Sequence, residues 1–252
     1  MTATVVDSYR EPLSGFTDSL ETPSLDLGTG TDRWVIVAAM VHDSGGFGGV
    51  NYSSCKIGGV SGTAMTSDAA DEVLTGIGIY KTYRLQGASV PSGNNTIYVK
   101  VDAVLYKMSC YVVWGAGSSA LGAATATAIG SSTSPAFTVS SASGDLAVAA
   151  LFGATTGSSI STYAGASGTT LDEYFSTQVS TDGYDTATLH KAGASSVTLN
   201  ATISNSQFTP GWWGRGWSVT SGGGGGPVTD AATGSAITVG LGTQAPGTAI
   251  GL

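Results

Sequence analysis

Short apolar segments recur along most of the chain, and each is bounded by Gly, Ser, Asn or Pro. Residues 33–42 are apolar on both faces of the expected strand, which predicts a strand buried on both sides. Residues 76–85 and 96–102 alternate between the two sides of a strand, and turn-forming residues 91–95 precede the second of them. The same kind of pattern predicts further strands at residues 106–114, 136–140, 145–152, 173–179, 184–190, 197–203 and 211–219.

Helical patterns are scarce by comparison. Residues 67–74 and 118–124 could form a helical turn or two, and no segment has the pattern of a long amphipathic helix. Strands do not alternate with helices, so a parallel α/β sheet is not expected. We therefore predict an all-β fold, an antiparallel β-sandwich or jelly roll with extended N-terminal and C-terminal arms.

Changes in composition divide the chain into four parts. Residues 1–31 form an acidic N-terminal arm that includes a first strand at 22–28, and residues 32–220 form the β-sandwich domain. A glycine-rich linker at 221–227, flexible by composition, leads to a C-terminal docking tail at 228–252.

The tail has one charged residue, Asp230, and an imperfect repeat in which residues 233–237 resemble residues 246–250. Twenty-five residues cannot bury their own apolar groups. We expect an extended segment that adds to a sheet edge of a neighbouring chain, with docking on its own domain as the alternative. The candidate assembly contacts are Ile237, Val239, Leu241, Ile250 and Leu252.

Composition narrows the range of functions. Only 10% of the 252 residues are charged, and Ala, Gly, Ser and Thr make up more than half of the chain, which excludes a long helical bundle. The net charge of -8 repels phosphate, so no nucleic-acid partner is expected. The longest uncharged apolar run, residues 34–41, is too short for membrane insertion as a helix. The first residues lack the basic and apolar regions of a signal peptide.

Residues able to do chemistry are few. His42 and His190 end predicted strands, and no Gly-x-Ser-x-Gly motif accompanies them, so we expect rim or turn residues. The carboxylate pairs Asp71-Glu72 and Asp172-Glu173 would point to opposite faces of a strand and are interpreted as solvated loop charges. Neither a zinc or calcium motif nor a P-loop occurs, so we predict no enzyme, no metal and no cofactor.

Two cysteines, Cys55 and Cys110, are too few for a disulfide framework. They could pair with each other, but two buried free thiols on strands are the preferred interpretation, because free cysteine is among the most buried residue types.

A cluster of aromatic residues near the end of the sandwich is the most distinctive local feature. If it forms a strand, Trp213, Arg215 and Trp217 share a face and Arg215 can stack on the indoles, while Trp212 points the other way. The preferred interpretation is a closing strand whose Trp residues cap the core. The alternative is an exposed platform that binds a glycan or receptor.

Several stretches resemble a sandwich domain of tailed-phage virion proteins and bacterial surface proteins. They are residues 22–38, 55–60 with 64–66, Ile79-Tyr80 with Tyr83, 91–101, 143–150 and 217–220. The resemblance covers roughly residues 20–220 and rests on strand and turn patterns without catalytic residues. It implies the fold, and by analogy the two arms look like assembly arms of virion proteins.

These observations lead to a non-enzymatic virion structural protein, most simply a capsid-surface decoration or spike subunit assembled in the host cytoplasm. Its partners would be capsid or tail subunits and copies of itself. The alternative is a tail-fibre or spike adhesin that binds a host glycan or receptor through an aromatic surface. A third hypothesis, a polysaccharide hydrolase, would need activity on host capsule and a carboxylate dyad.

Overall fold

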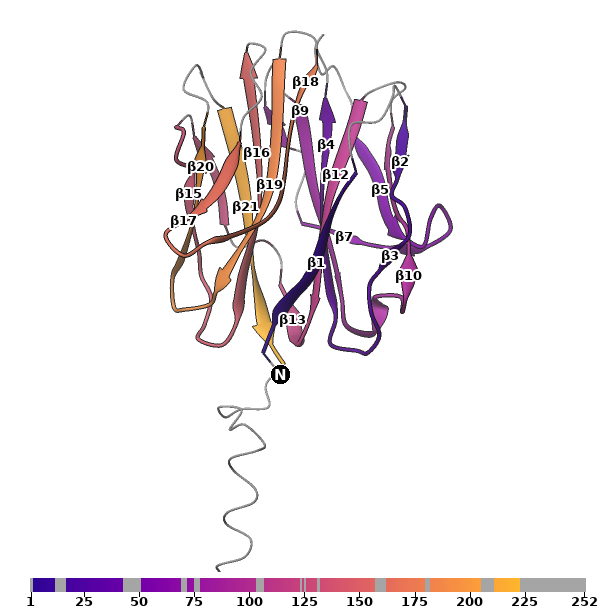
Figure 1. Cartoon of the computed structure of the whole chain (residues 1–252). Coiled ribbons are helices and arrows are strands. Elements are labelled where there is room, and N and C mark those ends of the chain that lie inside the picture. The colour runs from indigo at the N-terminus through magenta and orange to yellow at the C-terminus, as the bar shows by residue number, and fades with distance from the viewer. Residues whose placement is uncertain are drawn as a thin grey trace, which may run out of the picture.

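The computed structural model describes residues 2–11, 17–42, 51–68, 72–74, 78–102, 107–122, 124, 126–130, 132–156, 162–179, 182–204 and 211–222. Nearly all of its regular structure is antiparallel β-sheet, with one 3-10 turn at Gly87–Ser89. The sheets stack in four layers, which Figure 1 shows nearly edge-on. The predicted all-β sandwich fold is therefore confirmed.

The first half of the chain forms two of these layers, which we call the N-terminal sandwich. Its inner sheet has the order β1 (Thr4–Glu11), β12 (Lys107–Ala116), β4 (Trp34–His42), β9 (Gly78–Gln86) and β7 (Thr66–Ser67), and β8 (Glu72–Leu74) also pairs with β9. Its outer sheet has the order β2 (Ser19–Glu21), β11 (Ile97–Val101), β5 (Tyr52–Ile57) and β6 (Thr63–Ala64), and β3 (Leu25–Asp26) pairs separately with β10 (Asn94–Asn95).

The second half forms the other two layers, the C-terminal sandwich. Its inner sheet has the order β13 (Ser118–Leu121), β21 (Gly211–Ser221), β16 (Leu146–Thr156), β19 (Asp182–Ala192) and β18 (Thr170–Val179), and β14 (Ala126–Gly130) also pairs with β21. Its outer sheet consists of β15 (Ala136–Val139), β20 (Val197–Ile203) and β17 (Tyr163–Ala166), in that order.

The two sandwiches share one topology. In each inner sheet the last strand of that half lies beside a long central strand. In the N-terminal sandwich β12 lies between β1 and β4, and in the C-terminal sandwich β21 lies between β13 and β16. On the other side of the central strand, β9 lies between β4 and the edge strand β7, just as β19 lies between β16 and the edge strand β18. The outer sheets β2-β11-β5 and β15-β20-β17 correspond to each other as well. The single sandwich expected over residues 32–220 is thus two copies of one design, packed inner sheet to inner sheet (Figure 1).

The same type of hydrogen bond fixes the end of the last strand in both halves. Asp32, just before β4, accepts a hydrogen bond from the backbone N–H of Gly117 at the end of β12 (3.2 Å). Asp145, just before β16, accepts one from the backbone N–H of Ser221 at the end of β21 (3.0 Å). In each half an acidic residue at the start of the central strand therefore fastens the end of the last strand.

Three apolar cores lie between the four layers. Strand β4 serves two of them, because Val35 and Val37 belong to the core of the N-terminal sandwich, whereas Trp34 and Ile36 belong to the core between the sandwiches. A strand in this position must be apolar on both faces, which is the pattern that its sequence displays.

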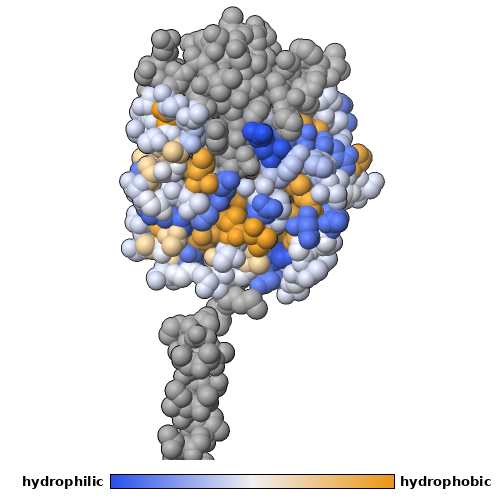
Figure 2. All heavy atoms as spheres, viewed as in Figure 1, coloured by the Kyte–Doolittle hydropathy of each residue, from blue (hydrophilic) through white to orange (hydrophobic). Residues whose placement is uncertain are grey.

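Outside these cores the described surface is mixed. Val6 and Val60 are the large hydrophobic residues that stand out as exposed, at 62% and 59%. Figure 2 shows the apolar residues of the viewed face in small patches separated by polar ones. No helix in the described ranges has the length and apolar character needed to cross a membrane.

Some local expectations were wrong. Residues Ser118–Leu121 form strand β13 instead of a helical turn. A helical turn was also expected at residues 67–74, but this segment holds β8 and the second residue of β7. The leader is not a free arm over Thr4–Glu11, because β1 pairs along β12 in the inner sheet. Within the first strand expected at residues 22–28, only Leu25–Asp26 is strand. The tail from residue 223 onward lies outside the described residues.

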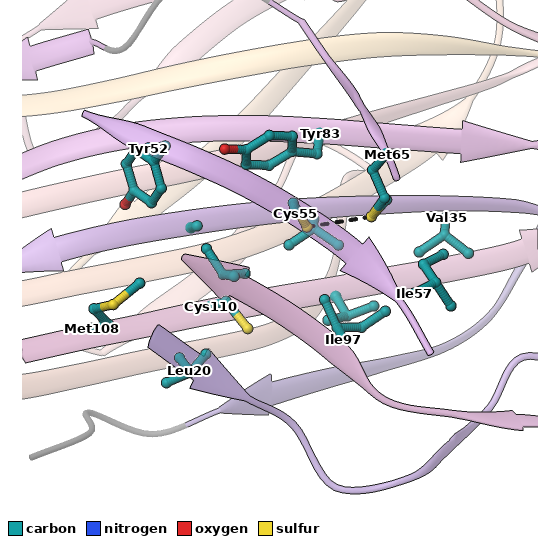
Figure 3. Close-up of a cluster of buried hydrophobic side chains, with 14 of the residues drawn as sticks. Leu20, Val35, Tyr52, Cys55, Ile57, Met65, Tyr83, Ile97, Met108 and Cys110 are labelled. Atoms are coloured by element: carbon teal, nitrogen blue, oxygen red, sulfur yellow. Dashed lines mark hydrogen bonds between the residues drawn. The ribbon is translucent and has the colours of Figure 1, made fainter. Parts of the chain in front are cut away.

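Both cysteines are free and buried in the core of the N-terminal sandwich, which confirms the preferred interpretation. Figure 3 shows Cys55 beside Met65, and their sulfur atoms are 3.4 Å apart. Burial raises the pKa of the Cys55 thiol and, together with the nearby Glu11, that of the Cys110 thiol. Both thiols therefore remain protonated in the folded protein well above neutral pH.

We expect a thiol reagent such as Ellman's reagent to leave the native protein unlabelled at pH 8 and to label two thiols after unfolding in guanidinium. The unfolded thiols ionise above about pH 9 while the folded ones do not. The free energy of unfolding should therefore fall as pH rises beyond that point, by up to about 1.4 kcal/mol per unit for each thiol. Rapid labelling of the native protein would contradict this assignment.

Candidate functional site

The aromatic cluster singled out in the sequence lies on β21, in the middle of the molecule. Trp213, Arg215 and Trp217 face the N-terminal sandwich, as their alternation predicts, whereas Trp212 faces the core of the C-terminal sandwich. Their exposed fractions are 0%, 2%, 0% and 5% in the order Trp213, Arg215, Trp217 and Trp212.

Side chains this deeply buried offer no surface on which a sugar could stack. The exposed-platform interpretation is therefore wrong for this cluster, and the structural interpretation agrees with the burial. A glycine allows this packing on β14, since a Cβ atom on Gly130 would collide with the indole of Trp212. The cluster serves cohesion between the sheets.

Arg215 brings a positive charge into this seam between the sandwiches. Its guanidinium carbon lies 4.6 Å from the ring centroid of Trp213, and Nη1 donates to the hydroxyl of Thr82 on β9 (3.0 Å). Trp213 in turn stacks on Tyr80, with centroids 5.8 Å apart and an angle of 11° between the planes. A buried guanidinium is costly unless hydrogen-bond acceptors and ring faces meet it, so these contacts make one relative position of the sandwiches favourable.

A second polar bridge crosses the seam at Asp68, which follows β7. Its side chain is fully buried and forms an ion pair with Arg84 of β9. The same carboxylate accepts hydrogen bonds from the indole N–H of Trp217 (3.1 Å) and the backbone N–H of Ala124 (3.3 Å). One buried carboxylate on the N-terminal sandwich therefore holds two donors of the C-terminal sandwich.

The C-terminal sandwich has an equivalent pair at the matching place. His190 of β19 pairs in register with Val148 of β16, just as Arg84 of β9 pairs with Ile36 of β4. The ring Nδ1 of His190 lies 2.6 Å from the carboxylate of Asp172, whose side chain is 6% exposed. Each sandwich thus places a basic side chain beside a buried carboxylate at the same position of its inner sheet.

This geometry corrects the expectation of a solvated loop charge at Asp172. The residue lies within β18 at a register shift between Leu171 and Glu173, where a bulge turns its side chain back toward His190. His190 is a residue of strand β19 with a side chain 24% exposed, not a turn residue.

The two pairs differ across the seam. By register, the counterpart of Trp217 in the N-terminal sandwich is Val113, because the two pair with Val148 and Ile36 respectively. Valine has no donor to offer, and Oδ2 of Asp172 is buried without a hydrogen-bond partner. In the described part of the chain, Asp172 therefore lacks the hydrogen bond to the opposite sandwich that Asp68 accepts from Trp217.

Over the described ranges, no Ser, Thr or Cys side chain hydrogen-bonds to the ring of His190, and no cluster of His, Cys, Asp and Glu could hold a metal. Asp71 and the side chains of His42, Glu72 and Glu173 lie outside the described residues, as do the tail contacts Ile237, Val239, Leu241, Ile250 and Leu252.

A further polar centre lies at the loop end of the N-terminal sandwich. Arg33 is 3% exposed, and its guanidinium donates to backbone carbonyls of Gly30 (2.8 Å), Pro91 (2.7 Å) and Val90 (2.5 Å). Three weaker contacts reach the carbonyls of Leu27 and Gly28 and the hydroxyl of Ser92. One side chain thus ties the loop before β4 to the loop before β10.

Sequence reasoning missed Asp68, Arg84 and Arg33 as buried polar centres. The only available signal was the scarcity of charge, since 9 Lys and Arg residues in 252 leave few for the surface if several are structural.

Comparison of the chain with models of protein families, with curated proteins and with solved structures finds no match.

Proposed function

We propose that this chain is a non-enzymatic structural protein of a tailed-phage particle, most simply a decoration or spike subunit on the capsid surface. The observation that carries the proposal is that buried charged side chains at the seam form hydrogen bonds between the two sandwiches. Arg215 and Asp68 both join one sandwich to the other, as expected of a body built for rigidity. The resemblance of residues 20–220 to virion sandwich domains supports the same role.

The proposed partners are copies of the chain and other capsid or tail subunits. The sparsely charged segment 228–252 is the proposed contact, because it begins just beyond the body and its alternating apolar residues suit addition to a sheet edge. Ala3 donates to the hydroxyl of Ser221 (3.0 Å), so the start of β1 and the exit of β21 lie together at one end of the body. An arm leaving there projects from a defined point.

The alternative role, an adhesin that uses the Trp cluster on β21, lacks a surface because those indoles are buried. A position in a tail fibre stays open within the proposal. The place of the chain in the particle would distinguish head from tail.

The test is occupancy in purified particles, measured by quantitative mass spectrometry and immunogold labelling. We expect the full chain in particles, and we expect its loss when residues 228–252 are replaced by a Gly/Ser segment of equal length. Circular dichroism should give the two proteins the same melting temperature, because the replacement spares the body. Normal occupancy of the replaced chain would overturn the tail contact, and absence of the full chain from particles would overturn the virion role.

A further inference from the structure

A small hollow of about 230 Å³ opens at the seam between the two sandwiches. It lies where β7, β9 and the turn after β9 meet the first strand of the C-terminal sandwich, β13. Its walls come from both sandwiches and are formed by Thr66, Arg84, Leu85, Gln86, Ser89 and Leu121. Among the features that the proposed function does not use, this one combines a cavity with several convergent polar groups.

The charged wall is the partly exposed Arg84, whose side chain is 19% accessible. One of its terminal nitrogens, Nη1, pairs with Asp68, and over the described ranges Nε and Nη2 have no protein partner. Asp68 neutralises the site as a whole. The hollow therefore offers N–H donors without a strong net positive charge.

The remaining polar wall is also rich in donors. The side-chain oxygen of Gln86 accepts a hydrogen bond from the backbone N–H of Leu121, which fixes the amide and leaves its NH₂ group available. Thr66 and Ser89 add two exposed hydroxyls. Leu121 supplies an apolar side chain to the wall, and Leu85 also lines the hollow while its side chain packs against the core of the N-terminal sandwich.

Donors around a small apolar patch suit a ligand that has many hydroxyl oxygens and a C–H face. The volume is below the roughly 300–1,000 Å³ of pockets for drug-sized molecules, which limits the ligand to about one sugar ring. The chain's net charge of -8 disfavours a polyanion. We propose that the hollow at the seam binds one ring of a neutral saccharide, with Arg84 and Gln86 as the anchoring donors.

This inference is independent of the virion role, because a chain that never assembles would still bind the sugar. The probes are free glucose, galactose, mannose and N-acetylglucosamine, with glucuronate as the acidic comparison. Saturation-transfer NMR and chemical-shift titration of the full chain would measure binding. We expect at least one neutral sugar to bind at millimolar concentration and to bind more tightly than glucuronate.

Two variants remove single hydroxyls from the wall without touching the Asp68–Arg84 pair, namely Thr66→Val and Ser89→Ala. Each should weaken binding by about five-fold, the usual effect of one lost hydrogen bond. The matched controls are Thr63→Val and Ser61→Ala, which remove exposed hydroxyls outside the hollow and should leave binding unchanged.

Three results would overturn the proposal. They are no binding of any neutral sugar at millimolar concentration, tighter binding of glucuronate, and equal loss of binding in the wall variants and the controls. Loss of particle occupancy with sugar binding intact would count against the assembly contact alone, so the two proposals can fail separately.

Discussion

Replacing Trp213 by alanine should lower the free energy of unfolding by about 3–5 kcal/mol, the usual cost of emptying a buried aromatic site. The indole is completely buried and contacts three partners. It stacks on Tyr80, lies against Phe152 at a centroid distance of 5.3 Å, and provides the ring face for Arg215. The substitution therefore leaves a cavity at the seam and removes the aromatic partner of a buried charge. Guanidinium denaturation followed by circular dichroism measures the loss.

Val6→Ala is the control, because Val6 is 62% exposed and its truncation should change the free energy of unfolding by less than about 0.5 kcal/mol. The exposed-platform hypothesis predicts the opposite result for Trp213→Ala, namely lost glycan binding at unchanged stability. An unfolding midpoint equal to that of the unmodified protein would show that the indole is not part of the core.

Replacing Arg33 by methionine should also cost about 3–5 kcal/mol, for a different reason. Methionine keeps much of the apolar volume but supplies no donor, so the carbonyls of Gly30, Val90 and Pro91 lose their shared partner. The bond to the Val90 carbonyl is buried and those to the Gly30 and Pro91 carbonyls are partly buried, and an acceptor left unsatisfied away from water costs about 1–3 kcal/mol. Denaturation gives the magnitude, and hydrogen exchange should show faster opening of the loops before β4 and β10 than of the C-terminal sandwich.

Lys100→Met provides the matched control, since Lys100 is 45% exposed and its nearest carboxylate, Asp18, is 3.8 Å away. We expect a change within about 0.5 kcal/mol. If Arg33→Met has an effect as small as that of Lys100→Met, the guanidinium does not hold the two loops together.

Strand positions were the most predictable part of this protein. The alternation at residues 96–102 and the continuous apolar run at 34–41 each correspond to a strand, because side-chain period and burial on one or two faces leave a direct record in the sequence. Strand β1 (Thr4–Glu11) was missed because its alternation is weak and it lies at the edge of its inner sheet, where three of its eight residues are exposed.

The burial of the cluster on β21 is a feature that side-chain alternation does not encode. Alternation correctly placed Trp213, Arg215 and Trp217 on one face. It could not tell whether that face met water or another sheet, because burial depends on partners that lie far away in the sequence. Tyr80 and Thr82, which meet Trp213 and Arg215, are more than 130 residues away.

The sequence by itself determined the class of fold, the low charge and the location of most strands, because these depend on local period and composition. Only the tertiary structure decided that the region expected to form one sandwich forms two, that Asp68 joins the two, and that Asp172 lies beside His190. Those features depend on which faces meet, and the contact of two faces is a property of the packed chain that no local pattern contains.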